Sequence, residues 1–189
     1  MELRDKVPHA LRNRFMKERV PVSKYASSFA FWNAEHGWNS GTNAKLRAGE
    51  EYTVRELLYA LMLPSGNDAA IALAEFFGPF LEPSATARAA EVCAPPPAGP
   101  EGAPHVWPHE HPISRFVAEM NRCVSRLGLF CPATPSTCLV SPHGMANDAN
   151  LSCAADIVAF TAAAMRYTFF QKVWPPASVY HCLDGHIIV

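Results

Sequence analysis

The chain has 189 residues, of which 49% are hydrophobic and 17% are charged, a balance typical of a globular protein with a core rather than a disordered chain. Its 16 Lys and Arg residues nearly match its 17 Asp and Glu residues, so charge gives no reason to expect nucleic acid or an anionic membrane as a partner. No apolar run approaches the roughly 20 residues that cross a bilayer, and we expect no signal peptide in the charged first 20 residues.

The first half of the chain predicts two helices separated by a sharp turn. Residues 1–20 are polar and basic and allow at most a short helix, and residues 21–50 mix aromatic residues with Gly, Asn and Ser, which indicates an extended, loop-rich segment. Thr53 and Glu56 form a T-x-x-E capping box that predicts a helix start. Pro64 predicts its end. Between Thr53 and Pro64, apolar residues occur at helical spacing, namely Val54, Leu57, Leu58, Leu61 and Met62.

The second helix is predicted over residues 68–77, "DAAIALAEFF", which are apolar on nearly every side. A helix of this kind is buried on most of its faces, and Gly78 and Pro79 predict its end. Residues 83–112 contain 8 of the 17 prolines and little aliphatic content, so we interpret them as a linker or an extruded surface loop.

The second half of the chain predicts helices over 113–127, with Gly128 as C-cap, and over about 152–165. Residues 136–141, "STCLVS", are a candidate strand between them. The tail alternates around Asp184-Gly185 and predicts a hairpin whose second strand is short. One face of the first of these helices carries Ile113, Phe116, Val117, Met120, Val124 and Leu127.

The turn between the first two helices, Ser65-Gly66-Asn67, presents a hydroxyl and a carboxamide from one rigid corner. A serine hydroxyl can both donate and accept a proton, and an asparagine amide can donate to a carbonyl and accept from a neighbouring N–H group. Packed helices on both sides would fix the geometry that catalysis needs. The alternative is an ordinary turn, because Ser, Gly and Asn are also common wherever a helix has to start again.

The surrounding segment, "LRAGEEYTVRELLYALMLPSGNDAAIALAEFFG", resembles the second-motif region of the serine D-alanyl-D-alanine carboxypeptidases, which are low-molecular-mass penicillin-binding proteins. Three later blocks extend the resemblance in the same order, the last of them more weakly, over about residues 20–78 and 113–182. These blocks are "FVAEMNRCVSRLGL", "VSPHGMANDANLSCAADIVAFTAAAM" and "FQKVWPPASVYHC".

The resemblance implies the α/β (α+β) penicillin-binding serine-hydrolase fold, with this chain forming mostly its helical part and a few sheet strands. Residues 1–189 would then be a partial domain with a Pro-rich insert at about 83–112. The family removes the terminal D-Ala of the peptidoglycan pentapeptide through an acyl-enzyme and is acylated by β-lactams. It requires no cofactor or metal and works outside the cytoplasm, in the periplasm or secreted.

The family's chemistry depends on three motifs, S-x-x-K, S-x-N and K-T-G. The resemblance identifies Ser65 and Asn67 as the S-x-N pair, whose serine passes a proton to the departing D-alanine and whose asparagine orients the substrate amide. No K-T-G occurs, and the only match to a hydroxyl residue followed by Lys three positions later is Thr42-Asn43-Ala44-Lys45, too close to Ser65 to be the nucleophile motif. We therefore expect the middle of a carboxypeptidase domain that is inactive as it stands.

Two other readings remain open. The chain could be a degenerate, non-catalytic relative that binds a peptide or a protein partner, with the Pro-rich insert as the contact. A β-lactamase, which shares the motifs, is weaker because those enzymes usually have S-D-N at the second motif. An upstream S-x-x-K and a downstream K-T-G in the gene would favour the truncated enzyme over the non-catalytic relative.

The remaining chemically active residues are better explained by structure than by catalysis. His105, His109 and His111 lie beside Glu110, but their spacing is not that of a structural zinc site, so solvated histidines of a surface loop are the preferred interpretation. His143 aligns with a turn histidine of the family and is a weak candidate for substrate binding. Pro142 and Gly144 beside it favour a role in stabilising the turn.

Asp156 is interpreted as an acid of a helix first turn rather than as a catalytic group. The six cysteines contain no C-x-x-C pair, and we interpret them as mostly buried thiols that leave the redox compartment open.

Overall fold

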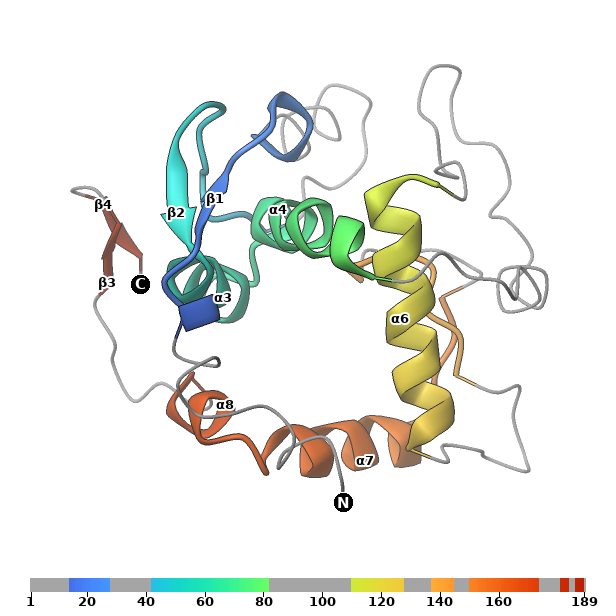
Figure 1. The fold of residues 1–189 in the computed structure, drawn as a ribbon. Helices are drawn as coiled ribbons and strands as arrows, with labels where there is room; N and C mark the ends of the chain where they lie inside the picture. Colours follow the sequence, from blue (N-terminus) through green and yellow to red (C-terminus); the bar gives the residue numbers. More distant parts are fainter. Residues whose placement is uncertain are drawn as a thin grey trace. The chain divides into compact units, whose positions relative to one another are not determined.

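The computed structural model describes residues 14–27, 42–81, 110–127, 137–144, 150–173, 181–183 and 186–188 (Figure 1). The chain divides into two compact units, Met1–Leu73 with Ser178–Val189, and Ala74–Ala177. Among the described residues, none of the helices is long and apolar enough to cross a membrane. The elements are β1 Arg19–Pro21, β2 Glu51–Thr53, α3 Val54–Met62, α4 Asn67–Phe77, the 3-10 helix η1 Gly78–Phe80, α6 Pro112–Arg126, α7 Ala154–Ala164, α8 Thr168–Val173, β3 His181–Leu183 and β4 His186–Ile188.

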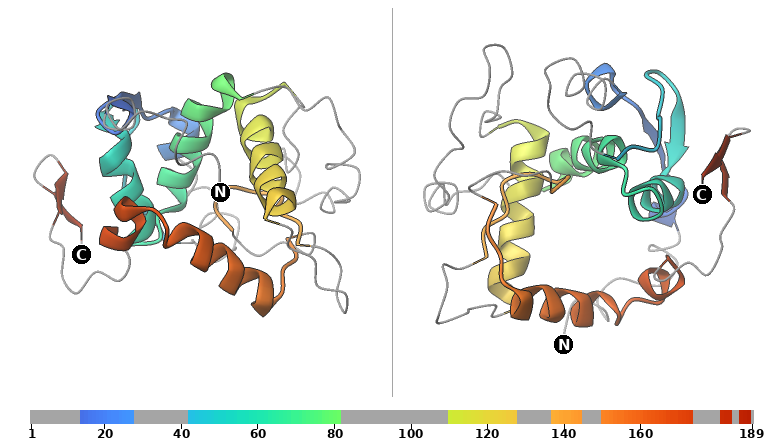
Figure 2. Two further views of the ribbon diagram at one scale, coloured as in Figure 1. Left: turned by 60° about the horizontal axis from the view of Figure 1, so that its bottom comes forward. Right: turned by 180° about the vertical axis from the view of Figure 1, so that it is seen from behind.

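Two short antiparallel strand pairs belong to the first unit, β1 with β2 and β3 with β4 (Figures 1 and 2). In the first pair Val20 lies opposite Tyr52, and both side chains are buried, whereas the strand positions on either side of them are exposed or half-buried. This alternation is the period of two expected for a strand with one face on the core. The sequence predicts neither strand, because three residues are too few for a readable period. The predicted tail hairpin, β3 and β4, is confirmed.

Helix α3 begins where the sequence predicts. The Glu56 N–H donates to the Thr53 side-chain oxygen at 3.2 Å, and the Thr53 N–H donates to the Glu56 carboxylate at 2.6 Å, which completes the capping box. The apolar face of α3 buries Val54, Leu57 and Ala60. The core of the first unit consists of these residues together with Val20, Val22, Ala26, Leu46, Tyr52 and the apolar start of α4, Ala69 to Leu73.

The turn from α3 to α4 requires glycine at position 66. The Gly66 N–H donates to the carbonyls of Ala60 at 3.1 Å and Leu61 at 3.2 Å, which folds the chain back onto the last turns of α3. A Cβ atom at Gly66 would lie 2.5 Å from the Ala60 carbonyl oxygen, closer than real Cβ contacts come. Helix α4 then begins at Asn67, and residues 69–74 are all buried, so the prediction of an apolar helix buried on most sides is confirmed.

Helix α6, in the second unit, begins at Pro112, one residue before the predicted start and inside the predicted Pro-rich insert, most of which lies outside the described residues. Proline is well suited to the first helical position because its missing N–H would have no partner there. His111 caps the helix, since its Nδ1 accepts a hydrogen bond from the Ile113 N–H at 3.3 Å. Ile113 and Val124 are buried, but Leu127 is 44% exposed, so the predicted apolar face does not extend to the C-cap. Gly128 lies outside the described residues.

The predicted strand at 136–141 is wrong for its described part, which forms only one bridge, between Cys138 and Leu151. The physical reason is that side chains form hydrogen bonds with the backbone N–H and C=O groups that would otherwise pair with a neighbouring strand. The Asn121 carboxamide of α6 donates to the Leu139 carbonyl at 2.7 Å and accepts from the Leu139 N–H at 2.9 Å. The next N–H, of Val140, donates to the Asn150 side chain at 3.4 Å.

Helix α7 lies within the predicted range 152–165, but a charged side chain of its first turn is buried while two neighbouring apolar side chains are exposed. Asp156, in the first turn, is 4% exposed, whereas the neighbouring Ile157 and Val158 are 52% and 67% exposed. The Thr137 hydroxyl donates to the Asp156 carboxylate and lies 3.0 Å from the Ser152 hydroxyl. Asp156 is therefore a first-turn acid as predicted, and in addition a buried anchor for the segment that begins at Thr137.

Replacing Gly66 by alanine is expected to destabilise the chain by about 2 kcal/mol or more, because the new methyl group has to displace the Ala60 carbonyl. Urea denaturation followed by circular dichroism measures this loss. Gly49→Ala is the matched control: Gly49 has φ +85° but open space around it, so only the left-handed backbone penalty of about 1 kcal/mol applies. A smaller loss for Gly66→Ala than for Gly49→Ala would contradict the expected clash.

Candidate functional site

The candidate site is the elbow Ser65-Gly66-Asn67 between α3 and α4. Ser65 has φ +55°, in the left-handed region, and its side chain is exposed. A non-glycine residue in this conformation costs about 1 kcal/mol and persists only where neighbouring contacts hold it. The elbow therefore presents the Ser65 hydroxyl from a strained corner rather than from a relaxed turn.

Thr42 makes two hydrogen bonds to the backbone at and after the strained residue. Its hydroxyl donates to the Ser65 carbonyl at 2.7 Å, and its own carbonyl accepts from the Asn67 N–H at 3.0 Å. These two hydrogen bonds hold the peptide groups before and after Gly66, directly after Ser65 in the chain. The sequence gives Thr42 no such role, since the contact joins residues 23 positions apart.

Asn67 contributes a buried carboxamide to the elbow. The residue is 6% exposed, and within the described part of the chain its side chain makes no hydrogen bond. The Ser65 hydroxyl likewise has no hydrogen-bond partner among the described residues. Buried amides are nearly always hydrogen-bonded, so the partner of the Asn67 carboxamide is water, a bound molecule or a group outside the described residues.

Asp68, the next residue, is the polar anchor of the elbow and is 2% exposed. Its Oδ1 accepts from the backbone N–H groups of Ala44 and Ala69, each at 2.9 Å, and its Oδ2 accepts from the Leu46 N–H at 3.0 Å. A carboxylate in the first turn of a helix is also favoured by the helix dipole. The sequence signal for Asp68 was only its place in a helix first turn, because its partners on residues 44 and 46 are backbone groups.

The segment Thr42-Asn43-Ala44-Lys45 does not look like a nucleophile with its base. The Thr42 hydroxyl is used on the Ser65 carbonyl. Lys45 is exposed with φ +59°, and its N–H donates to the Asn43 side chain at 3.1 Å. The segment instead forms one wall of the elbow.

His143 belongs to the second unit, whereas the elbow belongs to the first. Its Nδ1 lies 3.5 Å from the Ser141 hydroxyl oxygen, which also accepts from the Gly144 N–H at 3.3 Å. Gly144 has φ +70°, as a tight turn requires. Burial lowers the pKa of His143 from 6.5 to about 4, so the imidazole is neutral at neutral pH. These contacts support the turn-stabilising interpretation of the imidazole.

Of the three histidines predicted in the surface loop, the structure describes one. His111 is the N-cap of α6, while His105 and His109 lie outside the described residues. Over the described ranges no group of three or more His, Cys, Asp or Glu side chains is arranged to hold a metal ion.

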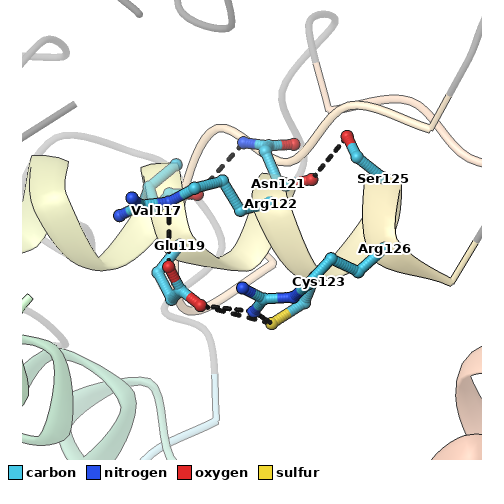
Figure 3. Close-up of polar contacts among 7 residues, drawn as sticks. All are labelled: Val117, Glu119, Asn121, Arg122, Cys123, Ser125 and Arg126. Atoms are coloured by element: carbon cyan, nitrogen blue, oxygen red, sulfur yellow. Dashed lines mark hydrogen bonds and ion pairs between the residues drawn. The ribbon is translucent and has the colours of Figure 1, made fainter. Parts of the chain in front are cut away.

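The expectation that the cysteines are mostly buried thiols is wrong where the structure describes them. Cys138 is buried and disulfide-bonded. Cys153 is a half-buried free thiol, and Cys123 is a free thiol exposed on α6. Figure 3 shows Cys123 beside Glu119 and Arg126, and the Arg126 guanidinium donates to the Cys123 sulfur at 3.0 Å and to the Glu119 carboxylate.

Residues 8–79, which include the whole elbow, match the family model described as D-alanyl-D-alanine carboxypeptidase. A carboxypeptidase of that name from Streptomyces sp. strain K15 is 30% identical over 168 residues, which are 89% of this chain and 45% of the relative. The D-alanyl-D-alanine carboxypeptidase DacF of Bacillus subtilis strain 168 is 26% identical over 157 residues, 83% of this chain and 28% of the relative. The chain thus spans less than half the length of these curated relatives.

Solved structures give the same result for the fold. The Streptomyces K15 DD-transpeptidase superposes with a TM-score of 0.59 at 28% identity, over 84% of this chain and 46% of that one. Penicillin binding protein 5 from Haemophilus influenzae superposes with a TM-score of 0.62 at 18% identity, over 94% of this chain and 39% of that one. The chain therefore has the DD-peptidase fold of penicillin-binding proteins, and its residues 8–79, which carry the elbow, are similar to the D-alanyl-D-alanine carboxypeptidase family.

Proposed function

We propose that this chain supplies the S-x-N pair, Ser65 and Asn67, of a serine-type D-alanyl-D-alanine carboxypeptidase that acts on peptidoglycan stem peptides through an acyl-enzyme. One observation carries the proposal: the elbow combines an exposed hydroxyl on a strained backbone with a buried carboxamide that has no hydrogen-bond partner in the described part of the chain. Strained backbone of this kind is concentrated at active sites and ligand-binding sites.

The two side chains have complementary tasks in this proposal. The Asn67 carboxamide donates to the carbonyl and accepts from the N–H of the substrate peptide, which orients the bond to be cleaved. The Ser65 hydroxyl accepts a proton and donates another, so that the leaving D-alanine departs as a neutral amine. Both tasks depend on position more than on acidity, and the contacts of Thr42 and Asp68 support that position.

The nucleophile motif of this reaction, S-x-x-K, does not occur in the 189 residues. The single hydroxyl-x-x-lysine match places its hydroxyl on the Ser65 carbonyl, and no K-T-G occurs. We therefore propose that the chain as given binds without forming an acyl-enzyme. A complete catalytic centre would require an S-x-x-K serine and a K-T-G strand in addition to the elbow.

The first test of this proposal separates binding from reaction. A millimolar N-acylated peptide ending in D-Ala-D-Ala is expected to shift the backbone and Asn67 side-chain amide resonances of the elbow in ¹⁵N spectra, because Asn67 has hydrogen-bonding capacity to offer. The intact mass of the same chain after incubation with benzylpenicillin is expected to stay unchanged.

The control peptide ends in L-Ala-L-Ala, and Asn67→Ala is the matched variant for the peptide shifts. Absence of any shift at Ser65 and Asn67 with the D-Ala-D-Ala peptide would contradict the assignment of the elbow. A stoichiometric penicillin adduct that survives denaturation would contradict the proposed inactivity, and its position in a peptide map would identify the true nucleophile. Shifts with both peptides alike would favour the non-catalytic peptide-binding relative.

His143, in the second unit, stays a weak candidate for substrate binding, and the proposal for the elbow does not depend on it. Its buried position in the turn lowers the pKa to about 4, so at neutral pH the ring can donate or accept one hydrogen bond but brings no positive charge to an anionic peptide. A role as a cationic carboxylate binder is therefore not part of the proposal.

Proton NMR of His143 is expected to give a midpoint near pH 4 in the folded chain and near pH 6.5 in urea. Because the unfolded state takes up the proton first as the pH falls, the free energy of unfolding should decrease between pH 6.5 and pH 4, and His143→Gln should reduce that decrease. A folded-state midpoint near that of the urea-unfolded chain would show that the imidazole is not held in a desolvated turn.

We also propose an extracytoplasmic site of action, periplasmic or secreted, for this protein. The support is the disulfide at Cys138, since disulfides persist mainly in oxidising compartments. In protein isolated from its source under alkylating conditions, Cys138 is expected to be alkylated only after reduction, whereas the free thiol Cys123 is alkylated directly. Direct alkylation of Cys138 would remove the support for this location.

A further inference from the structure

Residues 42–46, here called the strap, run along the elbow and are joined to it by four hydrogen bonds. Two come from Thr42, whose hydroxyl donates to the Ser65 carbonyl and whose carbonyl accepts from the Asn67 N–H. The other two end on the Asp68 carboxylate, which accepts the N–H groups of Ala44 and Leu46. The strap is therefore tied at one end to the two proposed site residues and at the other to Asp68.

The hydrogen bonds to the Asp68 carboxylate hold the strap more strongly than the hydrogen bonds of Thr42 do. Asp68 is 2% exposed, and each of its oxygens accepts from a strap N–H at 2.9 or 3.0 Å. Hydrogen bonds to a carboxylate are roughly twice as strong as those between neutral groups, and they strengthen further away from water. Thr42, by contrast, is exposed and contributes neutral hydrogen bonds.

Close packing at the elbow links the hydrogen bonds of Asp68 to the position of the elbow backbone. A Cβ atom at Gly66 would lie 2.9 Å from Asp68 Oδ1 and 3.2 Å from the Ala44 side chain, so the elbow backbone, the carboxylate and the strap are in contact with one another. A shift of the strap away from Asp68 therefore also removes the surroundings that hold Ser65 at φ +55°.

We infer that Asp68 is a positioning residue for the S-x-N pair: it fixes the strap, and the strap holds Ser65 in the left-handed conformation and Asn67 at the start of α4. The catalytic meaning of this inference rests on the proposed function, whereas the mechanical link from Asp68 through the strap to Ser65 does not. Asp68 itself touches backbone groups of this chain and is given no contact with substrate.

The decisive variant is Asp68→Asn, which keeps the shape of the side chain but turns an acceptor toward a strap N–H into a donor. Amide exchange at Ala44 and Leu46 is expected to accelerate by at least about tenfold, and exchange at Asn67 is expected to follow because the strap also accepts its N–H. The three-bond coupling between the amide and α protons of Ser65, which reports φ, is expected to change. Amides in the middle of α3, such as that of Leu58, should change much less.

Asp156→Asn is the matched control, because Asp156 is also a buried carboxylate in a helix first turn but is bonded to Thr137 instead of the strap. It is expected to leave the exchange of Ala44, Leu46 and Asn67 and the coupling of Ser65 unchanged. A merely stabilising role of Asp68 would accelerate exchange in α3 and in the strap alike and leave the Ser65 coupling unchanged, and that result would overturn the inference.

Thr42→Val is a second test of the strap. It replaces Asp68→Asn as the deciding variant if Asp68→Asn does not fold. It removes one hydroxyl from an exposed residue and leaves the Asp68 contacts in place. The Ser65 coupling is expected to change while Ala44 and Leu46 stay protected, and an unchanged Ser65 coupling would overturn the role of the strap. Failure of the D-Ala-D-Ala peptide to shift the parent elbow would count against the proposed function alone, since none of these exchange and coupling measurements uses a ligand.

Discussion

The buried carboxylate of Asp68 is the constraint on which the candidate site depends. Helix α4 is apolar on nearly every side, so its first turn lies in the core, and a buried carboxylate there needs hydrogen-bond partners. Three backbone N–H groups meet this need for Asp68, and two of them come from a segment more than 20 residues earlier. The requirement to solvate one charge thus determines which loop lies against the elbow.

In the second unit, too, hydrogen bonds of polar side chains hold loop segments in place, with different donors. Asp156 is buried in the first turn of α7 and accepts from the Thr137 hydroxyl, and the Asn121 carboxamide of α6 pairs with both backbone groups of Leu139. The described strands are only three residues long, so polar side chains fix segments that longer sheets would fix through backbone ladders. Each unit therefore depends on a few buried polar side chains for its loop geometry.

Local features of the fold were predictable, and long-range ones were not. The capping box at Thr53, the apolar helix α4 and the tail hairpin all depend on neighbouring residues and were predicted from the sequence. The strand at 136–141 was wrong because Asn121, far away in the sequence, occupies its backbone groups. The motif predicts Ser65 and Asn67 as site residues, but the backbone conformation of Ser65 and the contacts of Thr42 and Asp68 carry no sequence pattern.

The left-handed conformation of Ser65 restricts which residue can stand at that position more than the proposed chemistry does. Threonine carries the same hydroxyl, yet its branched Cβ fits poorly at φ +55°, where bulky side chains collide with the neighbouring carbonyl. Glycine and asparagine tolerate that backbone but have no hydroxyl to relay a proton. Serine alone among the hydroxyl residues combines the hydroxyl group with a side chain small enough for the corner, so steric selection and chemical selection favour the same residue.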